Sequence, residues 1–341
     1  MQWRGAEVPP FICVGISPPA LIPEVVAMFA SVVIPTYNRR PILEKCLEAL
    51  ESQACDGVID RYEVVVIDDG STDGTPQWLR SATRRFPHVR LLEQEHGGPA
   101  AARNRGVRQA LGDVIVFIDS DLVVTPSFLA SHGRSLQRAW QLSGDRLCFT
   151  YGAVINTADF DDPTSERHKL RDLSWAYFAT GNVAIDRVVL ERSGLFDTGF
   201  SLYGWEDLEL GERLRRMGVK LIKCPEAVGY HWHPAFTLDQ ISKLIRVEGE
   251  RARMGLVFYR KHPSRRVRFI IQFTWLHRML WELLTLGGLV NEKTLRPILR
   301  WLIRRGRSGT AMELLRLPLN CIGVRTLFRE ARASKINCPL L

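Results

Sequence analysis

The chain has 341 residues, of which 46% are hydrophobic, and this size suits one large α/β domain with an appendage or two domains. Its net charge of +9 is uneven, because residues 246–341 carry 20 Lys and Arg against 6 Asp and Glu, whereas the first 245 residues carry a net charge of −5. The seven cysteines contain no C-x-x-C pair, which excludes a disulfide framework and a zinc site and favours reduced thiols in the cytoplasm.

The first 29 residues have the pattern of neither a secretory signal nor a membrane span. They contain five prolines, which exclude a spanning helix, and Glu7 stands where a signal would have a basic stretch. We expect residues 1–29 to be an N-terminal extension. One expectation is that this extension has no regular structure. The other is that the start codon is misassigned and the protein begins at Met28, which lies just before the first strong strand.

From residue 31 the chain alternates between buried strands and amphipathic helices. The predicted strands span residues 31–35, 62–67, 89–93 and 114–118, and the predicted helices span residues 41–53, 75–86 and 99–110. Successive strand–helix–strand units are typical of a doubly wound, mostly parallel sheet. We therefore predict an α/β domain over residues 30–236, with two halves at 30–121 and 122–236.

An acidic motif, Asp119-Ser120-Asp121, directly follows the apolar run 114–118. Two carboxylates at i and i+2 point to the same side of an extended chain, and open α/β sheets bind ligands beyond the carboxyl ends of their strands. So few carboxylates suit a Mg²⁺ or Mn²⁺ ion that takes its other ligands from water and a substrate diphosphate. No G-x-G-x-x-G follows the first strand and no G-x-x-x-x-G-K-[ST] is present, which disfavours a dinucleotide-binding Rossmann domain and a P-loop NTPase.

Four ordered motifs carry a family resemblance. The runs SVVIPTYNRR, VVVIDDGSTDGT, GGPAAARNRG and VIVFIDSD, over residues 31–121, resemble the nucleotide-binding half of the family-two glycosyltransferases, which have the Rossmann-like GT-A fold. The resemblance implies that nucleotide-binding residues are Pro35, Thr36, Tyr37, Asp69, Arg103 near the diphosphate and Asp119 near the ribose, and that Asp121 binds the metal. A carboxylate such as Asp69 can accept the imide N–H of uracil, so we expect a UDP-sugar rather than a GDP-sugar donor.

A second group of candidate residues consists of Gly181, Asn182, Tyr203, Trp205, Glu206 and Asp207. The resemblance implies that Glu206 and Asp207 are catalytic, with Asp207 as the base, and that the other four contact the sugar or the acceptor. A carboxylate in the first turn of a helix is stabilised as the anion by the helix dipole, so Asp207 should be ionised at neutral pH and able to accept a proton. The alternative is that the acidic pair only caps the helix. Tyr203 and Trp205 suit stacking on a sugar, although isolated aromatic residues more often lie in the core.

Two histidines, His231 and His233, follow this helix. The resemblance implies that a histidine here is a further metal ligand, and imidazole suits Mn²⁺ better than Mg²⁺. His231 is the first candidate because a tyrosine precedes it, and His233 stays a rival because i, i+2 spacing places both on one side of an extended chain. The alternative is that both are surface histidines.

The processive polymer synthases of this family carry Q-x-x-R-W after the acidic pair and several membrane spans. Here Gln240 is followed by Ile-Ser-Lys-Leu, and no long uncharged apolar segment is present. We therefore expect a non-processive enzyme that adds one sugar or a few.

Residues 237–341 are predicted to be a helical, basic region. Residues 269–290 are long enough to span a membrane, but charged residues stand in their middle. One polar stripe consists of Thr274, Arg278, Glu282 and Thr285, which predicts a single amphipathic helix. Its basic flanks suit an anionic membrane surface, and packing on the catalytic domain is an equal alternative.

Together these observations predict an inverting, metal-dependent glycosyltransferase with Mn²⁺ or Mg²⁺ as cofactor. Its acceptor would be a hydroxyl of a glycan, a glycolipid or another lipid-linked molecule, or a cell-surface polysaccharide. We expect a cytoplasmic location with peripheral membrane contact, and no nucleic-acid partner, because nucleic-acid binding would leave the acidic motifs without a role. A pyrophosphorylase would carry a Gly-rich basic signature after its first strand, which is missing. The other alternative is a weak or inactive relative that binds sugar nucleotides as a partner subunit, although Asp121 and Asp207 are both present.

Overall fold

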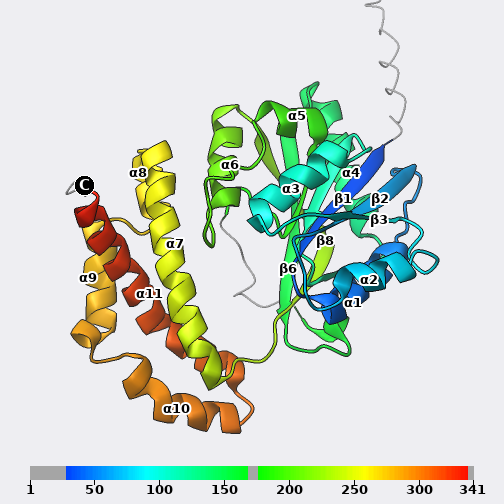
Figure 1. The fold of residues 1–341 in the computed structure, drawn as a ribbon. Helices are drawn as coiled ribbons and strands as arrows, with labels where there is room; N and C mark the ends of the chain where they lie inside the picture. Colours follow the sequence, from blue (N-terminus) through cyan, green and yellow to red (C-terminus); the bar gives the residue numbers. More distant parts are fainter. Residues whose placement is uncertain (1–27, 168–175, 337–341) are drawn as a thin grey trace, which may run out of the picture.

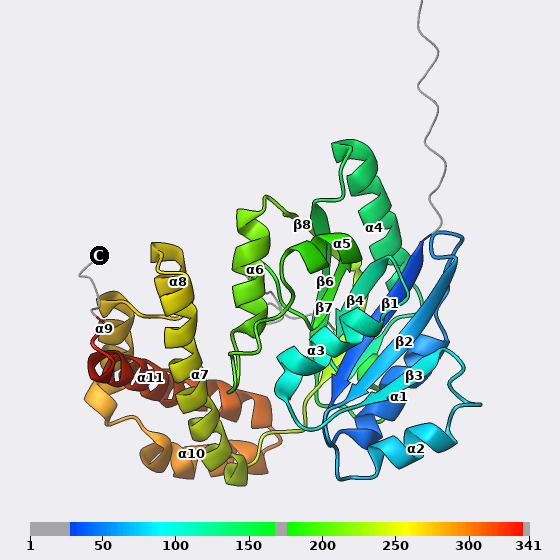
Figure 2. The ribbon, with the colours of Figure 1, turned by 45° about the horizontal axis from the view of Figure 1, so that its top comes forward.

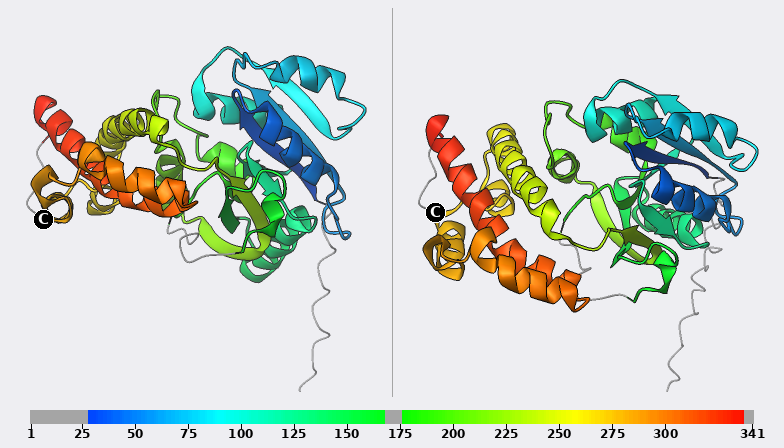
Figure 3. Two further views of the ribbon diagram at one scale, coloured as in Figure 1. Left: turned by 90° about the horizontal axis from the view of Figure 1, so that it is seen from below. Right: turned by 60° about the horizontal axis from the view of Figure 1, so that its bottom comes forward.

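The computed structural model describes residues 28–167 and 176–336 (Figure 1). In these ranges an α/β part built on one twisted sheet is followed by a helical part, and the two lie side by side in every view (Figures 2 and 3). The predicted α/β fold with a mostly parallel sheet and a helical C-terminal region is confirmed. Most of the predicted N-terminal extension lies outside the described residues.

The described strands form one sheet in the order β3-β2-β1-β4-β7-β6-β8-β5. Their bounds are β1 (Phe29–Thr36), β2 (Arg61–Asp68), β3 (Val89–Glu93), β4 (Val114–Ile118), β5 (Leu122–Val124), β6 (Cys148–Thr157), β7 (Asn182–Asp186) and β8 (Lys220–Trp232). The first four strands are parallel to one another, β7 is antiparallel to both β4 and β6, and β5 is antiparallel to β8. The carboxyl ends of β1, β2 and β4 therefore meet at one edge of the sheet.

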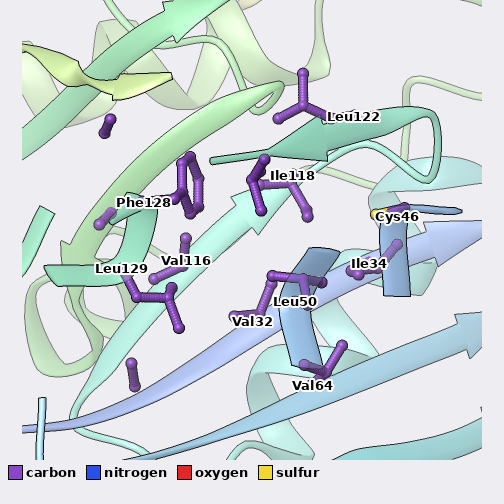
Figure 4. Close-up of a cluster of buried hydrophobic side chains, with 14 of the residues drawn as sticks. Val32, Ile34, Cys46, Leu50, Val64, Val116, Ile118, Leu122, Phe128 and Leu129 are labelled. Carbon is purple, nitrogen blue, oxygen red and sulfur yellow. The ribbon is translucent and has the colours of Figure 1, made fainter. Parts of the chain in front are cut away.

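Helices cover both faces of this sheet, with bounds α1 (Arg40–Glu51), α2 (Thr75–Ser81), α3 (Gly98–Gln109), α4 (Phe128–Ser143), α5 (Arg187–Arg192) and α6 (Glu206–Arg216). Alternate strand residues enter opposite core clusters. Val32 and Val64 pack with α1, α2 and α4 (Figure 4), whereas Val33 and Val65 pack with α3, α5 and α6. The central strand β4 is apolar throughout and fully buried, because helices cover both faces of the sheet there. The predicted helix 75–86 ends early, at Ser81, and a turn over residues 82–85 follows it.

The helical part comprises η3 (Leu238–Gln240), α7 (Ile241–Lys261), α8 (Arg265–Ile270), α9 (Trp275–Leu284), η4 (Leu286–Gly288), α10 (Glu292–Arg304) and α11 (Ser308–Ala333). It is joined to the α/β part by an apolar cluster that includes Trp205. Two ion pairs reinforce this junction, between Lys261 and Asp197 (2.5 Å) and between His262 and Glu209 (2.7 Å). Within the described ranges, every helix is too short or too polar to cross a bilayer.

The single helix predicted over residues 269–290 is wrong. The chain leaves helical geometry after α8, and the hydroxyl of Thr274 accepts the backbone N–H of His277 as the N-cap of α9. Gly287 and Gly288 adopt positive φ angles of 67° and 98° beyond α9. A capping threonine and two glycines therefore outweigh the helical periodicity from which the continuous helix was predicted.

Candidate active site

The acidic turn joins β4 to β5 at the edge where the parallel strands end. The backbone N–H of Leu122 closes the turn by donating to the carbonyl of Asp119 (3.1 Å). Asp121 is only 4% exposed, whereas the side chain of Asp119 is 31% exposed. The two carboxylates therefore occupy different surroundings and need not have the same role.

Asp121 meets both candidate histidines, although they lie far apart in the sequence. Antiparallel pairing of β5 with β8 sets Leu122 opposite His231, and His231 Nε2 lies 2.9 Å from Asp121 Oδ1. The rings of His231 and His233 are 4.1 Å apart, and one ligand atom from each of the three residues lies within 4.8 Å of the others. A carboxylate and two imidazoles are a donor set that fits Mn²⁺. The sequence treated the histidines as rivals, and the structure brings both to Asp121.

These three side chains change one another's pKa. Burial disfavours ionisation of Asp121, but the hydrogen bond and charge of His231 outweigh it and lower the pKa of Asp121. Burial disfavours the charged form of His231 too, yet the Asp121 carboxylate raises the pKa of His231. Burial, together with the charge of His231, lowers the pKa of His233 to about 4. His233 is therefore a neutral imidazole at pH 7, which is the form that binds metal ions.

Arg39 contacts the same carboxylate and was not predicted. Its guanidinium donates to Asp121 Oδ2, while the Arg39 side chain stays 46% exposed. A guanidinium and a divalent cation are alternative ways to neutralise a buried carboxylate, so an ion that used both oxygens would displace Arg39. Arg39 lies within the first motif, SVVIPTYNRR, but nothing in its spacing connects it to Asp121.

An aromatic wall stands beside the ends of β1 and β3. Tyr37 is 45% exposed, and its ring centroid lies 4.4 Å from that of His96. Behind this wall the carboxylate of Asp69 accepts the backbone N–H groups of Gly97 and Gly98, both at 2.9 Å. Asp69 therefore shapes the loop before α3, a role that the sequence did not indicate. His96 was also missed, because it lies between recognisable motifs.

Buried oxygens at the ends of β1 and β2 lack partners. Thr36, next to Pro35, pairs with Asp68 across the sheet, and both residues are 2% exposed. Thr36 Oγ1 and Asp68 Oδ1 have no hydrogen-bond partner among the described residues, whereas Asp68 Oδ2 accepts the N–H of Ser71 (2.9 Å) as a turn residue would. Unpaired buried oxygens cost free energy unless a ligand or water satisfies them, so they mark this edge as a site for a polar ligand.

Arg103 joins the two acidic motifs. It extends from α3, and its Nη2 and Nη1 atoms lie 3.0 Å from carboxylate oxygens of Asp119 and Glu206, respectively. Burial disfavours its charge, but Asp119, Glu206 and Asp207 outweigh the burial and raise the pKa of Arg103. We therefore find Arg103 holding both carboxylate motifs in place, in the region where the sequence predicted a diphosphate contact.

Helix α3 can carry Arg103 into this position because its sheet-facing side is small. A Cβ atom added at Gly106 would lie 2.5 Å from Val33 Cγ1, so no larger residue fits there without displacement. The close approach of α3 to β1 brings the start of the helix next to the acidic turn.

The start of α6 has an unusual backbone. Gly204 and Trp205 have φ angles of 92° and 78°, and the left-handed region is rare for a bulky side chain. The indole N–H of Trp205 donates to the carbonyl of Arg251 in α7 (2.7 Å), and Trp205 is only 8% exposed. This anchor fixes the turn that presents Glu206 and Asp207. The predicted stacking of Trp205 on a sugar does not fit this placement, because the ring packs in the core.

Asp207 differs from its expected ionisation. Burial raises the pKa of Asp207 to about 7, the charge of Glu206 adds to the increase, and the charge of Arg103 opposes it. At Asp207, burial and the charge of Glu206 therefore outweigh the helix dipole, which favours the ionised carboxylate. Since Glu206 is committed to Arg103, Asp207 is the carboxyl of the pair that is available for proton transfer. A carboxyl with a pKa near the working pH is a better general base than an ordinary one.

Asn182 is not available to a sugar or an acceptor, so this prediction is wrong. It is 0% exposed, and its amide group donates to the carbonyls of Ala153 and Ala227, both at 2.9 Å. Its oxygen lies 2.8 Å from His132 Nε2, and burial lowers the pKa of His132 to about 4, so that ring is neutral. Asn182 therefore ties β6, β7 and β8 together.

The two remaining sugar candidates border open space. A Cβ at Gly181 would lie 3.4 Å from Asp119 Oδ2, so Gly181 lies against the acidic turn, and Tyr203 is 60% exposed. A cavity of about 460 Å³ lies between α6 and helices α7 and α8. Its lining includes Leu208, which follows the candidate base, and Phe269 of α8.

Comparison with known proteins places this geometry in context. Residues 31–192 match the family model described as glycosyl transferase family 2. Glycosyltransferase AglE of Haloferax volcanii is 30% identical over 218 residues, which cover 63% of this chain and 70% of the relative. Validoxylamine A glucosyltransferase of Streptomyces hygroscopicus subsp. jinggangensis is 30% identical over 270 residues, or 69% of this chain and 61% of the relative.

Two further comparisons involve one curated relative and one solved structure. The uncharacterized glycosyltransferase YfnE of Bacillus subtilis is 27% identical over 261 residues, or 61% of this chain and 66% of the relative. The chain thus spans less than two thirds of YfnE and of the glucosyltransferase. The solved mannosyltransferase PcManGT of Pyrobaculum calidifontis has a similar fold, with a TM-score of 0.56, 21% identity and 92% coverage of both chains.

Proposed function

This chain belongs to glycosyl transferase family 2, and we propose that it transfers one sugar from a nucleoside-diphosphate sugar to an acceptor hydroxyl. The observation that carries the proposal is the meeting of two acidic motifs at one sheet edge: Asp121 with two histidines, and Asp207 next to Glu206, which Arg103 links to Asp119. The names of the relatives, a glucosyltransferase among them, support this reaction class.

The donor site would be divided between a metal end and a base end. Asp121, His231 and His233 would hold Mn²⁺ or Mg²⁺, which when bound neutralises charge on the leaving diphosphate. Tyr37 would stack on the base, while Asp69 and the unpaired Thr36 hydroxyl would accept or donate hydrogen bonds. The remaining nucleotide contacts would come from Pro35, Arg103 and Asp119. UDP is the favoured nucleotide, and GDP is its first competitor because PcManGT was solved with GDP-Man and Mn²⁺.

Asp207 would act as the base of a single displacement. The acceptor oxygen bonds to the anomeric carbon as the bond from that carbon to the diphosphate oxygen breaks, and the hydroxyl proton moves to Asp207. The sugar ring develops positive charge in the transition state, as in glycoside hydrolysis, and the attack from the opposite face inverts the anomeric configuration. Glu206 and Arg103 would position this carboxyl rather than exchange the proton.

The acceptor would approach α6 from the cavity between α6 and α8. Leu208 lies on one side of that cavity and Phe269 and Ile270 on the other, with Glu212, Arg251 and Arg266 among the remaining lining residues, so apolar and charged surface lie near the proposed base. Such a surface suits a glycan ring or the first part of a lipid-linked acceptor. Tyr203 and Gly181 would contact the sugars from the open side, and transfer would take place in the cytoplasm.

Thermal denaturation with UDP, GDP, dTDP or CMP, each with and without Mn²⁺, tests the donor site, because a ligand of the folded state raises the melting temperature. We expect a Mn²⁺-dependent shift with UDP that Asp121→Ala abolishes. Asp113→Ala, at the opposite end of β4, is the matched control and should keep the shift. No shift with any nucleotide would overturn the proposal. A shift without any transfer or hydrolysis of the donor sugar would instead indicate an inactive sugar-nucleotide-binding protein.

A further inference from the structure

Helix α9 exposes a continuous apolar stripe. Leu276, Met279, Leu280 and Leu283 follow the i, i+3, i+4, i+7 spacing of one helix face, and they are 63%, 69%, 43% and 71% exposed. Ten of the sixteen large hydrophobic side chains that are exposed in the described chain lie between residues 269 and 301. Clustering of this kind marks an interaction surface, whereas single exposed hydrophobic residues do not.

The polar stripe of α9 lies on its inner side. Glu282 accepts a hydrogen bond from Arg325 Nε of α11 (2.8 Å), and Thr285 is 0% exposed. The indole N–H of Trp281 donates to Gln272 (2.6 Å). A helix in water normally buries its apolar residues. In α9 the tryptophans Trp275 and Trp281 do pack against the helical core, but the leucines and Met279 stay exposed. The alternative that the apolar side of α9 packs on the catalytic domain is therefore wrong. This side instead faces an apolar medium or a partner molecule.

The apolar surface continues beyond α9. We define the α9 face as Leu276, Met279, Leu280, Leu283, Leu286 and Leu289, which are all exposed. On α10, Ile298 and Trp301 are also exposed, at 46% and 47%. Both helices lie at the outer edge of the helical part, away from the sheet (Figures 1 and 2). A flat surface that approaches the helical part from this edge could contact α9 and α10 without touching the α/β part.

The charge beside the α9 face is positive. Lys293, Arg296, Arg300 and Arg304 share one face of α10 through spacings of three and four residues, and all are exposed. None of these four has a carboxylate within 4.0 Å in the part of the chain that the structure describes. The guanidinium of Arg305 lies 4.4 Å from the ring centroid of Trp301. Apolar side chains, a tryptophan and free basic groups are the composition of helices that lie in the headgroup layer of anionic membranes.

We propose that the α9 face binds the surface of an anionic lipid bilayer. The leucines and Met279 enter the boundary between headgroups and acyl chains, and the basic face of α10 contacts the acidic headgroups. A second copy of the chain is a poor occupant, because two copies would bring like-charged α10 helices together. This binding depends on the helical part alone, so it stands or falls independently of the donor site.

Vesicle flotation of the full chain tests the proposal, with phosphatidylcholine vesicles compared with vesicles that also contain phosphatidylglycerol. At low salt we expect binding to the anionic vesicles only, and a Met279→Glu/Leu283→Glu variant should reduce the partition constant at least about tenfold. Leu142→Glu is the matched control, because Leu142 is 80% exposed on α4 of the α/β part and should have no effect.

Three results would overturn the proposal. The first is equal flotation of the wild type and the Met279→Glu/Leu283→Glu variant, and the second is no flotation on anionic vesicles at low salt. The third is concentration-dependent self-association in size-exclusion chromatography that this variant abolishes while no lipid is bound, which would assign the face to a second copy. Thermal unfolding without ligand, recorded on the same samples, shows that each variant is folded, so the control does not depend on the donor site.

Discussion

Asp207 links the proposed chemistry to the stability of the fold. Burial, with the charge of Glu206, raises its pKa from 3.8 to about 7, so in the folded state the carboxyl keeps its proton where the unfolded chain has lost it. For a group whose folded pKa is raised, the stability present at low pH is lost as the pH rises, here between about 4 and 7. Each pKa unit corresponds to about 1.4 kcal/mol, so ionised Asp207 lowers the free energy of unfolding by at most about 4 kcal/mol.

Asp207→Asn removes this ionisation and preserves the shape of the side chain. In urea unfolding at pH 5 and pH 8, the stability of the variant relative to the wild type should increase by about 2–3 kcal/mol at the higher pH. Its transferase activity should fall at least about 100-fold, and kcat/KM of the wild type should rise with pH through about 7 as the base ionises. Asp113→Asn, which alters an exposed carboxylate, should change neither the pH dependence of stability nor the transferase activity. A relative stability of Asp207→Asn that is the same at both pH values would refute the raised pKa and the reasoning built on it.

Three further predictions follow from the contacts of the site. Arg39→Met should strengthen Mn²⁺ binding several-fold in a metal titration, because it removes the guanidinium that competes for Asp121; unchanged affinity would show that Arg39 does not compete. His231→Ala and His233→Ala should each weaken Mn²⁺ binding at least about tenfold, and an effect in only one of them would reduce the ligand set to two residues. Asn182→Ala should lower the free energy of unfolding by about 1–3 kcal/mol, because it leaves two carbonyls unpaired. A loss of activity at unchanged stability would return Asn182 to the sugar site.

The sequence was sufficient for the α/β fold and for the edge of the sheet at which the site lies. Strands buried on both faces are continuous apolar runs, so β1, β2 and β4 and the motifs at their ends could be located directly. The metal cluster needed the structure, because Asp121 and His231 are brought together by the pairing of β5 with β8. Such pairing is determined by tertiary packing, and a strand as short as β5 gives no periodic signal of its own.

Burial was the second quantity that the sequence could not supply. Asn182 and Trp205 stand in motifs beside catalytic residues, yet one ties three strands together and the other anchors α6 to α7. The position of Asp207 at the start of a helix, and hence the effect of the dipole, could be predicted from the sequence, but the burial that dominates its pKa could not. The polar stripe of α9 was identified from its spacing, but which side of the helix faces outward depends on α11, more than 20 residues further on.

The distribution of charge explains why this site would need a metal ion. Its carboxylates are Asp119, Asp121, Glu206 and Asp207, and its guanidiniums are Arg39 and Arg103. Without a metal ion both guanidiniums are paired with carboxylates, which offsets their charge before a donor diphosphate binds. A diphosphate would thus bring further negative charge to a region without spare positive charge, which in a partly buried site costs several kcal/mol. A divalent cation on Asp121 and the two histidines would supply that charge without breaking the contacts by which Arg103 holds Asp119 and Glu206.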